Sequence, residues 1–527
     1  MNVREDWRIA LLVILIVASG VSLFAPQVGG SGGGTNSVGT DASAENDAGD
    51  LTNLQYGLEL SGGTRVRAPL VGLTAEDVPV GANNSTQVAE TLTERLGVTP
   101  TDVQIRQRGP QTADVELFSQ NVSQQELAQT LGAAGVQASP EDIRDGVTQE
   151  TVQTTVDVLD SKVSQAGLSG ATVQTVQSGD KTYVLVEVPN ANRSEVLDLI
   201  GNRGQVELVA HYPVQRNGTT VYRDETVLTR EGIAQIGTAQ PPQGGDPAQV
   251  PISLTDQAAE PFANDMQRFG FTQNPSSCRY QERPNDAGYC LYTVVDGRVV
   301  YAAGVRANLA QDFANGEFAR NPSFVVTASN ISEANQLQIN LQAGAIPTEL
   351  DIQGEGTTQF ILPSLGTRFK LYALVTGITA VLAVSLVVYL RYRETRIAAP
   401  MIVTAFSEVF LLLGFAAAVG LALDLSHIAG LIAVIGTGVD DLIIIADEVL
   451  QQSETRTRRV FRRRFRKAFW PIAAAAATLI VAMAPLSVLS LGDLRGFAIV
   501  TIVGVLIGVL ITRPAYGDVL QKLMLNK

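Results

Sequence analysis

The sequence predicts a membrane protein with an α-helical bundle of six transmembrane helices and a large external α+β region. Of the 527 residues, 45% are hydrophobic and only 17% are charged. The apolar runs are confined to the N-terminus and to the chain after about residue 369, and the middle is polar. Apolar runs of roughly 20 residues around one long polar segment are typical of a membrane protein with a single water-facing region.

Apolar runs define the predicted spans. They cover residues 9–25, 369–390, 400–423, 428–446, 469–491 and 496–511. The first and last are shorter than the roughly 20 residues that cross a bilayer and would rely on flanking residues. The first run follows a charged start, but SLFAPQ is a poor cleavage site, so we expect an uncleaved anchor more than a signal peptide.

Basic loops predict the orientation. RYRETR at 391–396 and RTRRVFRRRFRK at 456–467 should both be cytoplasmic, because Lys and Arg are enriched in cytoplasmic loops. Both termini are then expected in the cytoplasm, with the segment from about 26 to 368 on the outer face. The second loop could also bind nucleic acid or anionic lipid, but we favour the topological explanation. A net charge of -14 argues against a nucleic-acid partner.

The polar region divides into expected domains. Two stretches, 88–135 and 156–201, resemble each other at an offset of about 70 residues, and each reads as helix, strand, strand, helix. This order predicts two ferredoxin-like modules. The expected division is a first transmembrane helix at 1–26, a Gly/Ser-rich linker at 27–50, a base domain at 51–210, an inserted head at 211–325, a return to the base at 326–367 and a five-helix bundle at 368–527.

The external region carries no pattern of an enzyme. It lacks a nucleophile elbow, a metal-ligand cluster and a phosphate-binding glycine loop, so we expect a binding or conformational module without a cofactor. The two cysteines, Cys278 and Cys290, can form a disulfide if the region faces an oxidising exterior, or remain unpaired thiols. With no CxxC and two distant histidines, no zinc site is expected.

Several stretches resemble the SecD family of protein-export membrane proteins. They are YGLELSGGTRVRA, VDVLDSKVSQAGLSGATVQ, LQAGAIPTELDI, ILPSLGTRF, GLIAVIGTGVDDLIIIADEVL and LGDLRGFAIVTIVGVLIG. They occur in the family's order over most of the chain, and 211–325 is the least similar part. The motif residues that this resemblance singles out are Gly57, Glu59, Gly62 and Gly63 outside the membrane, and Gly436, Gly438 and Asp440 in the fourth helix.

The resemblance also implies a function. Members of this family work with SecF in a twelve-helix, RND-type assembly beside the Sec translocon. They assist the export of secreted polypeptides with an ion gradient, either proton or sodium, in place of ATP. Membrane lipids and secreted polypeptides are then expected partners, and nucleic acid is not. The acidic, Lys-poor composition is typical of a salt-adapted organism such as a haloarchaeon.

Adjacent carboxylates lie within the predicted fourth helix. Asp440 matches the family's Asp, whereas Asp441 and Leu442 replace the small residue and Asn that follow it there. A carboxylate at membrane depth costs about 2.5–3.5 kcal/mol on insertion scales and usually faces a bundle interior or a watery cavity. We therefore expect Asp440 to couple ions; the alternative is a permanently protonated Asp in a helix–helix hydrogen bond. Asp441 could tune it or define a variant site.

Further polar residues could join this site. Glu408 lies about eight residues into the third apolar run, at a depth similar to that of Asp440 and Asp441, so the three could form one acidic cluster. Alternatively, Glu408 faces water or pairs with another helix. Thr478 is a weaker candidate for a polar lining. No Lys or Arg of this chain is expected at that depth, so a balancing cation would come from SecF.

Other functions are compatible with this layout. One is half of an RND-type exporter of small molecules or lipids, which usually carries twelve helices in one chain. Another is a membrane-anchored chaperone without ion transport, which would leave the intramembrane acids unexplained.

Overall fold

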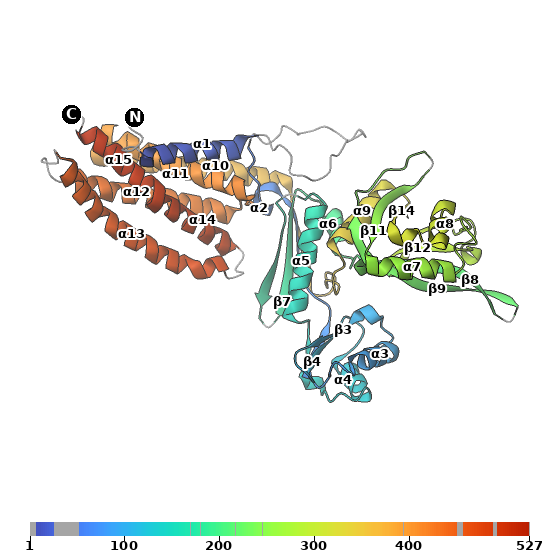
Figure 1. The fold of residues 1–527 in the computed structure, drawn as a ribbon. Coiled ribbons are helices and arrows are strands. Elements are labelled where there is room, and N and C mark those ends of the chain that lie inside the picture. The colour runs from blue at the N-terminus through green and yellow to red at the C-terminus, as the bar shows by residue number, and fades with distance from the viewer. Residues whose placement is uncertain are drawn as a thin grey trace.

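A computed structural model describes residues 7–25, 52–168, 170–179, 181–216, 218–244, 246–393, 395–450, 457–488 and 493–525. The linker expected at 27–50 lies outside these residues. Figure 1 shows a helical bundle joined to an extramembrane region of three units, a base beside the bundle and two lobes beyond it.

The described part of the chain contains six helices long and apolar enough to cross a membrane, by length and composition. Their bounds are α1 (Trp7–Phe24), α10 (Pro363–Tyr392), α11 (Thr395–Val419), α12 (Leu425–Leu450), α13 (Arg458–Val488), and α14 (Asp493–Ile507) continued by α15 (Arg513–Leu525). A π-helical turn, η6 (Gly508–Thr512), joins α14 to α15 without breaking the rod. The last span therefore extends to Met524, beyond the expected limit of 511.

The bundle has two distinct ends. The loop between α11 and α12 lies against the base, and we call this end the near end. Helices α1 and α15 place the described chain ends at the opposite, far end (Figure 1). Since α12 runs from the near end to the far end, the basic start of α13 also lies at the far end.

The base is a ferredoxin-like module assembled from distant parts of the chain. Its elements are β1 (Gly63–Pro69), α5 (Gln149–Gln165), β6 (Thr172–Ser178), β7 (Lys181–Pro189), α6 (Arg193–Ile200) and β15 (Thr357–Ile361). The sheet order is β15-β1-β7-β6 and every pair is antiparallel. This βαββαβ order with interleaved strands is the ferredoxin-like topology.

The lobe below the base in Figure 1 is a second ferredoxin-like module, inserted between β1 and α5. Its elements are β2 (Leu73–Val78), α3 (Ser85–Leu96), β3 (Val103–Gln107), β4 (Ala113–Leu117), α4 (Gln124–Ala133) and β5 (Ile143–Asp145), in the sheet order β3-β4-β2-β5. The helices pack through Val88, Leu92, Leu127 and Leu131 onto one face of the sheet. The prediction of two ferredoxin-like modules is confirmed, although they are nested and not in tandem.

The other lobe, the head, is inserted between α6 and β15. One sheet has the order β13-β12-β8-β9 and the other β10-β11-β14. The strands are β8 (Val206–Arg216), β9 (Thr219–Thr229), β10 (Ile233–Ile236), β11 (Ala248–Leu254), β12 (Cys290–Val295), β13 (Arg298–Ala303) and β14 (Ser323–Ala328). The helices are α7 (Asp256–Arg268), α8 (Ala307–Asn315) and α9 (Ile331–Ala343). Cys278 and Cys290 form a disulfide.

The head uses more of the chain than the expected segment 211–325. Strand β14 pairs with β11, as in Val326 with Val250, and helix α9 buries Leu337 and Leu341 in the head core. The alternating pattern of β14 and the helical pattern of α9 predict that both are buried in a core. Such a pattern does not say whether that core belongs to the base or to the head.

A buried lysine lies where the base meets the head. Lys162 on α5 is fully buried, and its Nζ donates to the carbonyl oxygens of Asn202 and Arg203 at 3.1 and 3.2 Å. The next residue, Gly204, donates its N–H to Asp296 of the head at 3.0 Å. Burial lowers the pKa of Lys162 from its usual 10.5 to about 8, partly offset by Asp296.

The low pKa of Lys162 predicts a pH-dependent stability. Between about pH 8 and 10.5 the unfolded chain holds a proton at Lys162 that the folded chain releases, so stability should rise with pH across this window. We expect a gain of about 3 kcal/mol in the unfolding free energy of the full chain. Lys162→Met should abolish this rise, whereas Lys181→Met, which removes an exposed partner of Glu355, should retain it. Equal pH profiles for the wild type and Lys162→Met would contradict the assignment.

Candidate functional site

A cluster of ionisable side chains lies at mid-depth in the helical bundle, and of its members only the Asp441 side chain, at 23%, is appreciably exposed. Arg513 is 1% exposed and Glu408 is 2% exposed. Arg513 donates from Nη1 to Oε1 of Glu408 at 2.9 Å, and from Nε to Oδ2 of Asp441 at 3.2 Å. Thr512 donates from Oγ1 to the second oxygen of Glu408 at 3.1 Å. One guanidinium thus bridges carboxylates from α11 and α12.

Glycines provide the space for this cluster. Gly438 lies one turn before Asp441 on α12, and a Cβ there would stand 3.2 Å from Oε2 of Glu408 and 3.4 Å from Nη2 of Arg513. A Cβ on Gly508 would overlap the Arg513 guanidinium itself. The π-helical turn from Gly508 to Thr512 sets the direction of Arg513, and such turns often occur at functional sites.

The charges of the cluster do not balance when every group is ionised. Two carboxylates share one guanidinium, so the fully ionised cluster has one negative charge in excess. A buried excess charge is costly, and uptake of one proton or one small cation would neutralise it. Because both carboxylates bind the same guanidinium, a change in the charge of one alters the electrostatic environment of the other. The arrangement can therefore hold and release a single positive charge inside the bundle.

A second set of contacts joins the base to the near end of the bundle. Gly57 donates its N–H to the Leu423 carbonyl at 2.9 Å, and Leu423 donates to Gln55 at 2.9 Å. Glu59 accepts a hydrogen bond from the Leu425 N–H at 3.3 Å. A Cβ on Gly57 would overlap the Asp424 carboxylate. This close approach explains why a glycine stands at position 57.

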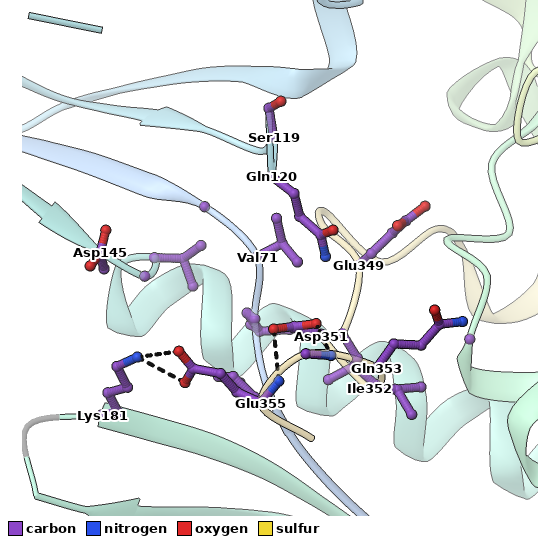
Figure 2. Close-up of a pocket in the computed structure, with 18 of the residues that line it drawn as sticks. Val71, Ser119, Gln120, Asp145, Lys181, Glu349, Asp351, Ile352, Gln353 and Glu355 are labelled. Atoms are coloured by element: carbon purple, nitrogen blue, oxygen red, sulfur yellow. Dashed lines mark hydrogen bonds and ion pairs between the residues drawn. The ribbon is translucent and has the colours of Figure 1, made fainter. Parts of the chain in front are cut away.

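A large cleft lies in the extramembrane region, remote from the buried cluster. It measures about 1210 Å3 and separates the second ferredoxin-like module from the base. Figure 2 shows its floor, where Lys181 pairs with Glu355 at 2.6 Å and Asp351 accepts the N–H groups of Gly354 and Glu355. The acids drawn there take part in these bonds or are exposed to water, and the cleft lies along the seam between the two modules.

A groove of about 550 Å3 lies in the head between the ends of its two sheets. It is lined by residues 301–305, at the end of β13, and 323–327 of β14. Each of these strands is at the edge of its sheet among the described residues. Unpaired strand edges can receive an extended polypeptide by adding a strand.

Comparisons with known proteins identify the family. Residues 349–513 match the family model described as protein export membrane protein SecD/SecF, C-terminal. The chain is 49% identical to the protein-export membrane protein SecD of Haloferax volcanii, over 99% of each chain. It is 48% identical to that of Haloquadratum walsbyi, again over 99% of each. The chain belongs to the SecD family.

Membership of the SecD family makes the chain a multi-pass membrane protein with an accessory role in protein export. The crystal structure of SecDF, a translocon-associated membrane protein from Thermus thermophilus, matches with 18% identity and a TM-score of 0.48. That match covers 99% of this chain and 59% of the other, so this chain spans less than two thirds of the SecDF chain. The acidic composition fits the haloarchaeal relatives.

The structure brings together some of the residues that the SecD resemblance and the sequence single out. Glu408 and Asp441 meet in the buried cluster. Asp440, the position that matches the SecD motif, points away from it and is exposed on the surface of the chain. Adjacent helical residues diverge by about 100°, so the two acids cannot face the same neighbours. Thr478 is also exposed and donates only to Ala475 of its own helix.

The expectation that no cation of this chain lies at membrane depth is wrong. The last apolar run was expected to end at 511, two residues before Arg513. The helix instead continues, and Tyr516 and Leu520 are buried at intervals of three and seven residues after Arg513. This apolar spacing beyond the arginine was the available sequence signal.

Proposed function

We propose that this SecD-family chain works with a SecF partner to promote export of polypeptides, using a proton or sodium gradient. The buried Glu408–Arg513–Asp441 cluster carries this proposal. Ionisable groups inside a membrane bundle are expensive and mark ion pathways. The cluster can exist with or without one extra positive charge, as ion coupling requires.

The charge state of the cluster would select between helix arrangements. With one carboxylate neutralised, Arg513 needs only one anionic partner; with both ionised, it holds α11 and α12 together through two ion pairs. The π-helical turn beside Arg513 is an irregularity of the kind that often occurs at functional sites, and we expect it to adjust as these pairs exchange. Ion binding on one side and release on the other would then move α12 relative to α15.

Movement of α12 can reach the extramembrane region through its near end. The hydrogen bonds of Gly57 and Glu59 attach the base to residues 423 and 425, directly before and at the start of α12. In this proposal the far end, with its exposed arginines, is cytoplasmic. The head groove then lies on the outer side, where an emerging polypeptide would meet it.

Asp440 has a separate part in the proposal. It lies on the surface of α12 near the depth of the cluster but turned outward. A carboxylate at this depth is costly, and a partner subunit that gives it a hydrogen-bond donor or a cation lowers that cost. We assign Asp440 to the interface with SecF and the Glu408–Asp441 pair to ion binding within this chain.

Export into membrane vesicles under separately imposed proton and sodium gradients tests the proposal. In the wild type we expect one of the two gradients to stimulate export. Glu408→Gln and Asp441→Asn should each abolish most of that stimulation, because the cluster can no longer exchange its charge. Thr379→Ala is a control, since Thr379 faces outward on α10 and bonds only to Val375. Full gradient-stimulated export by both cluster variants would rule out ion coupling here and favour an anchored binding role.

A further inference from the structure

The first turns of α13 carry a row of arginines at the far end of the bundle. Arg459, Arg462, Arg463 and Arg466 are all exposed. Their spacing of three, four and seven residues from the first places them on one face of the helix. Within the described part of the chain, none of these four makes a hydrogen bond or an ion pair. We call this set the arginine row.

The opposite face of the same helix fixes the direction of the row. Phe461 and Phe465 stack on one another, and Phe465 lies so close to Gly517 of α15 that no side chain fits there. Two other cations of this segment, Arg464 and Lys467, turn to α12 and pair with Glu448 at 3.7 and 3.0 Å. These contacts fix the rotation of α13 about its axis. The arginine row therefore points away from the bundle.

The row lies at the level where the span leaves the hydrocarbon. Trp470 continues the same face eleven residues after Arg459 and is 70% exposed. Exposed tryptophans on membrane helices mark the interface with the headgroups. At 1.5 Å per residue, the row extends from about 6 Å to about 17 Å beyond Trp470 along the helix axis. Arg466, the member of the row nearest Trp470, is thus next to the headgroups.

We propose that the arginine row binds the phosphates of anionic lipid headgroups in the leaflet at the far end. A guanidinium presents a planar fork that matches phosphate oxygens and binds them by two hydrogen bonds. All four members are arginine, and clusters of four or more basic residues beside a span are typical of anionic-lipid recognition. A preference for basic loops at one end accounts for the charge. It does not require four arginines on one face that have no partner among the described residues.

Other partners fit the row less well. Nucleic acid would have to approach a protein with a net charge of -14. High salt limits attraction at a distance, because the screening length is about 3 Å at 1 M. Direct hydrogen bonds between a guanidinium and a phosphate act within that length. A lipid phosphate is held at the membrane surface next to the row, so it needs no long-range attraction.

Fluorescence of Trp470 tests the proposal at the site itself. The chain has two tryptophans, so Trp7→Phe leaves Trp470 as the only one. The full chain is reconstituted into phosphatidylcholine bilayers with a small fraction of brominated lipid, which quenches a nearby tryptophan. Brominated phosphatidylglycerol should quench Trp470 with an apparent affinity at least about fivefold higher than that of brominated phosphatidylcholine.

Matched variants separate the row from general charge. R459Q/R462Q/R463Q/R466Q should abolish the preference for phosphatidylglycerol. R216Q/R223Q/R298Q/R320Q, which neutralises four exposed arginines of the head, should retain it with the same change in net charge. If the fourfold row variant fails to insert, R459Q/R463Q and R462Q/R466Q are compared in its place and should each reduce the preference.

Three results would overturn the proposal. One is equal quenching by the two lipids in the parent chain. Another is an unchanged preference after the row is neutralised. The third is displacement of phosphatidylglycerol by inorganic phosphate at millimolar concentration, which would indicate a site for free anions. The proposal is supported if the head variant keeps the preference for phosphatidylglycerol and the row variant loses it.

Discussion

Arg513→Gln is expected to lower the unfolding free energy of the chain by about 3–5 kcal/mol, because it leaves two carboxylates in the bundle without their shared cation. Arg513 is almost fully buried and makes ion pairs with both Glu408 and Asp441. The loss should appear in unfolding of the detergent-solubilised full chain. Export should be lost as well, because without Arg513 the two carboxylates lack the shared cation whose ion pairs exchange in the proposed cycle.

A double-mutant cycle separates the ion pair from simple loss of packing. Glu408→Gln with Arg513→Gln removes both charges, so the double variant should be less destabilised than the sum of the two single variants. Arg513→Lys keeps the positive charge but lacks the planar guanidinium that binds two carboxylates at once. Its unfolding free energy should lie between those of the wild type and Arg513→Gln. If the two single effects simply add, the bridge contributes nothing and the cluster is not coupled.

Gly63→Ala is expected to disrupt the base by several kcal/mol. Gly63 has a φ of +135°, which costs other residues about 1–3 kcal/mol. A Cβ there would also overlap the carbonyl oxygen of Val188 on β7, and backbone overlap of this kind typically costs a further 1–3 kcal/mol or so. Since β1 begins at Gly63, the whole β15-β1-β7-β6 sheet is affected, and the thermal unfolding of the chain should shift to lower temperature.

Gly97→Ala is the matched control for this prediction. Gly97 also has a positive φ, of +67°, at the end of α3, but a Cβ there meets no atom within 4 Å. Its substitution should cost only about 1 kcal/mol, through backbone conformation alone. Equal effects of the Gly63 and Gly97 substitutions would show that the contact with β7 does not matter.

Local patterns predicted much of the fold. The helix, strand, strand, helix order of each repeat identified both ferredoxin-like modules, since period and capping residues are local properties. The nesting was not predictable in this way. Arg67 on β1 pairs with Leu185 on one side and Thr357 on the other, and no periodicity in the sequence connects such distant strands.

The candidate site was predicted in part. Glu408 and Asp441 lie a similar number of residues from the same end of two helices. Because the loop between α11 and α12 is short, these helices were expected to be neighbours, and this was enough to place Glu408 near Asp441. The rotation of α12 about its axis decided between Asp440 and Asp441, and this rotation depends on packing mainly against α14, with α10, α11 and α13 as further neighbours. Arg513 was missed because a charged residue marks the end of an apolar run when only the sequence is considered. In the bundle its charge is compensated by two acids from other helices, so the membrane span continues past it.

The nesting of the base also sets an order of assembly during synthesis. All strands and helices of the second ferredoxin-like module are contiguous from β2 to β5, so this lobe can fold as soon as it has emerged. The base cannot complete its sheet until β15 arrives, after the whole head has been made. Because α10 starts directly after β15, the sheet closes only as the second membrane helix begins to be synthesised. Strand β1 must therefore remain without one of its partners for most of the time that the extramembrane region is being made.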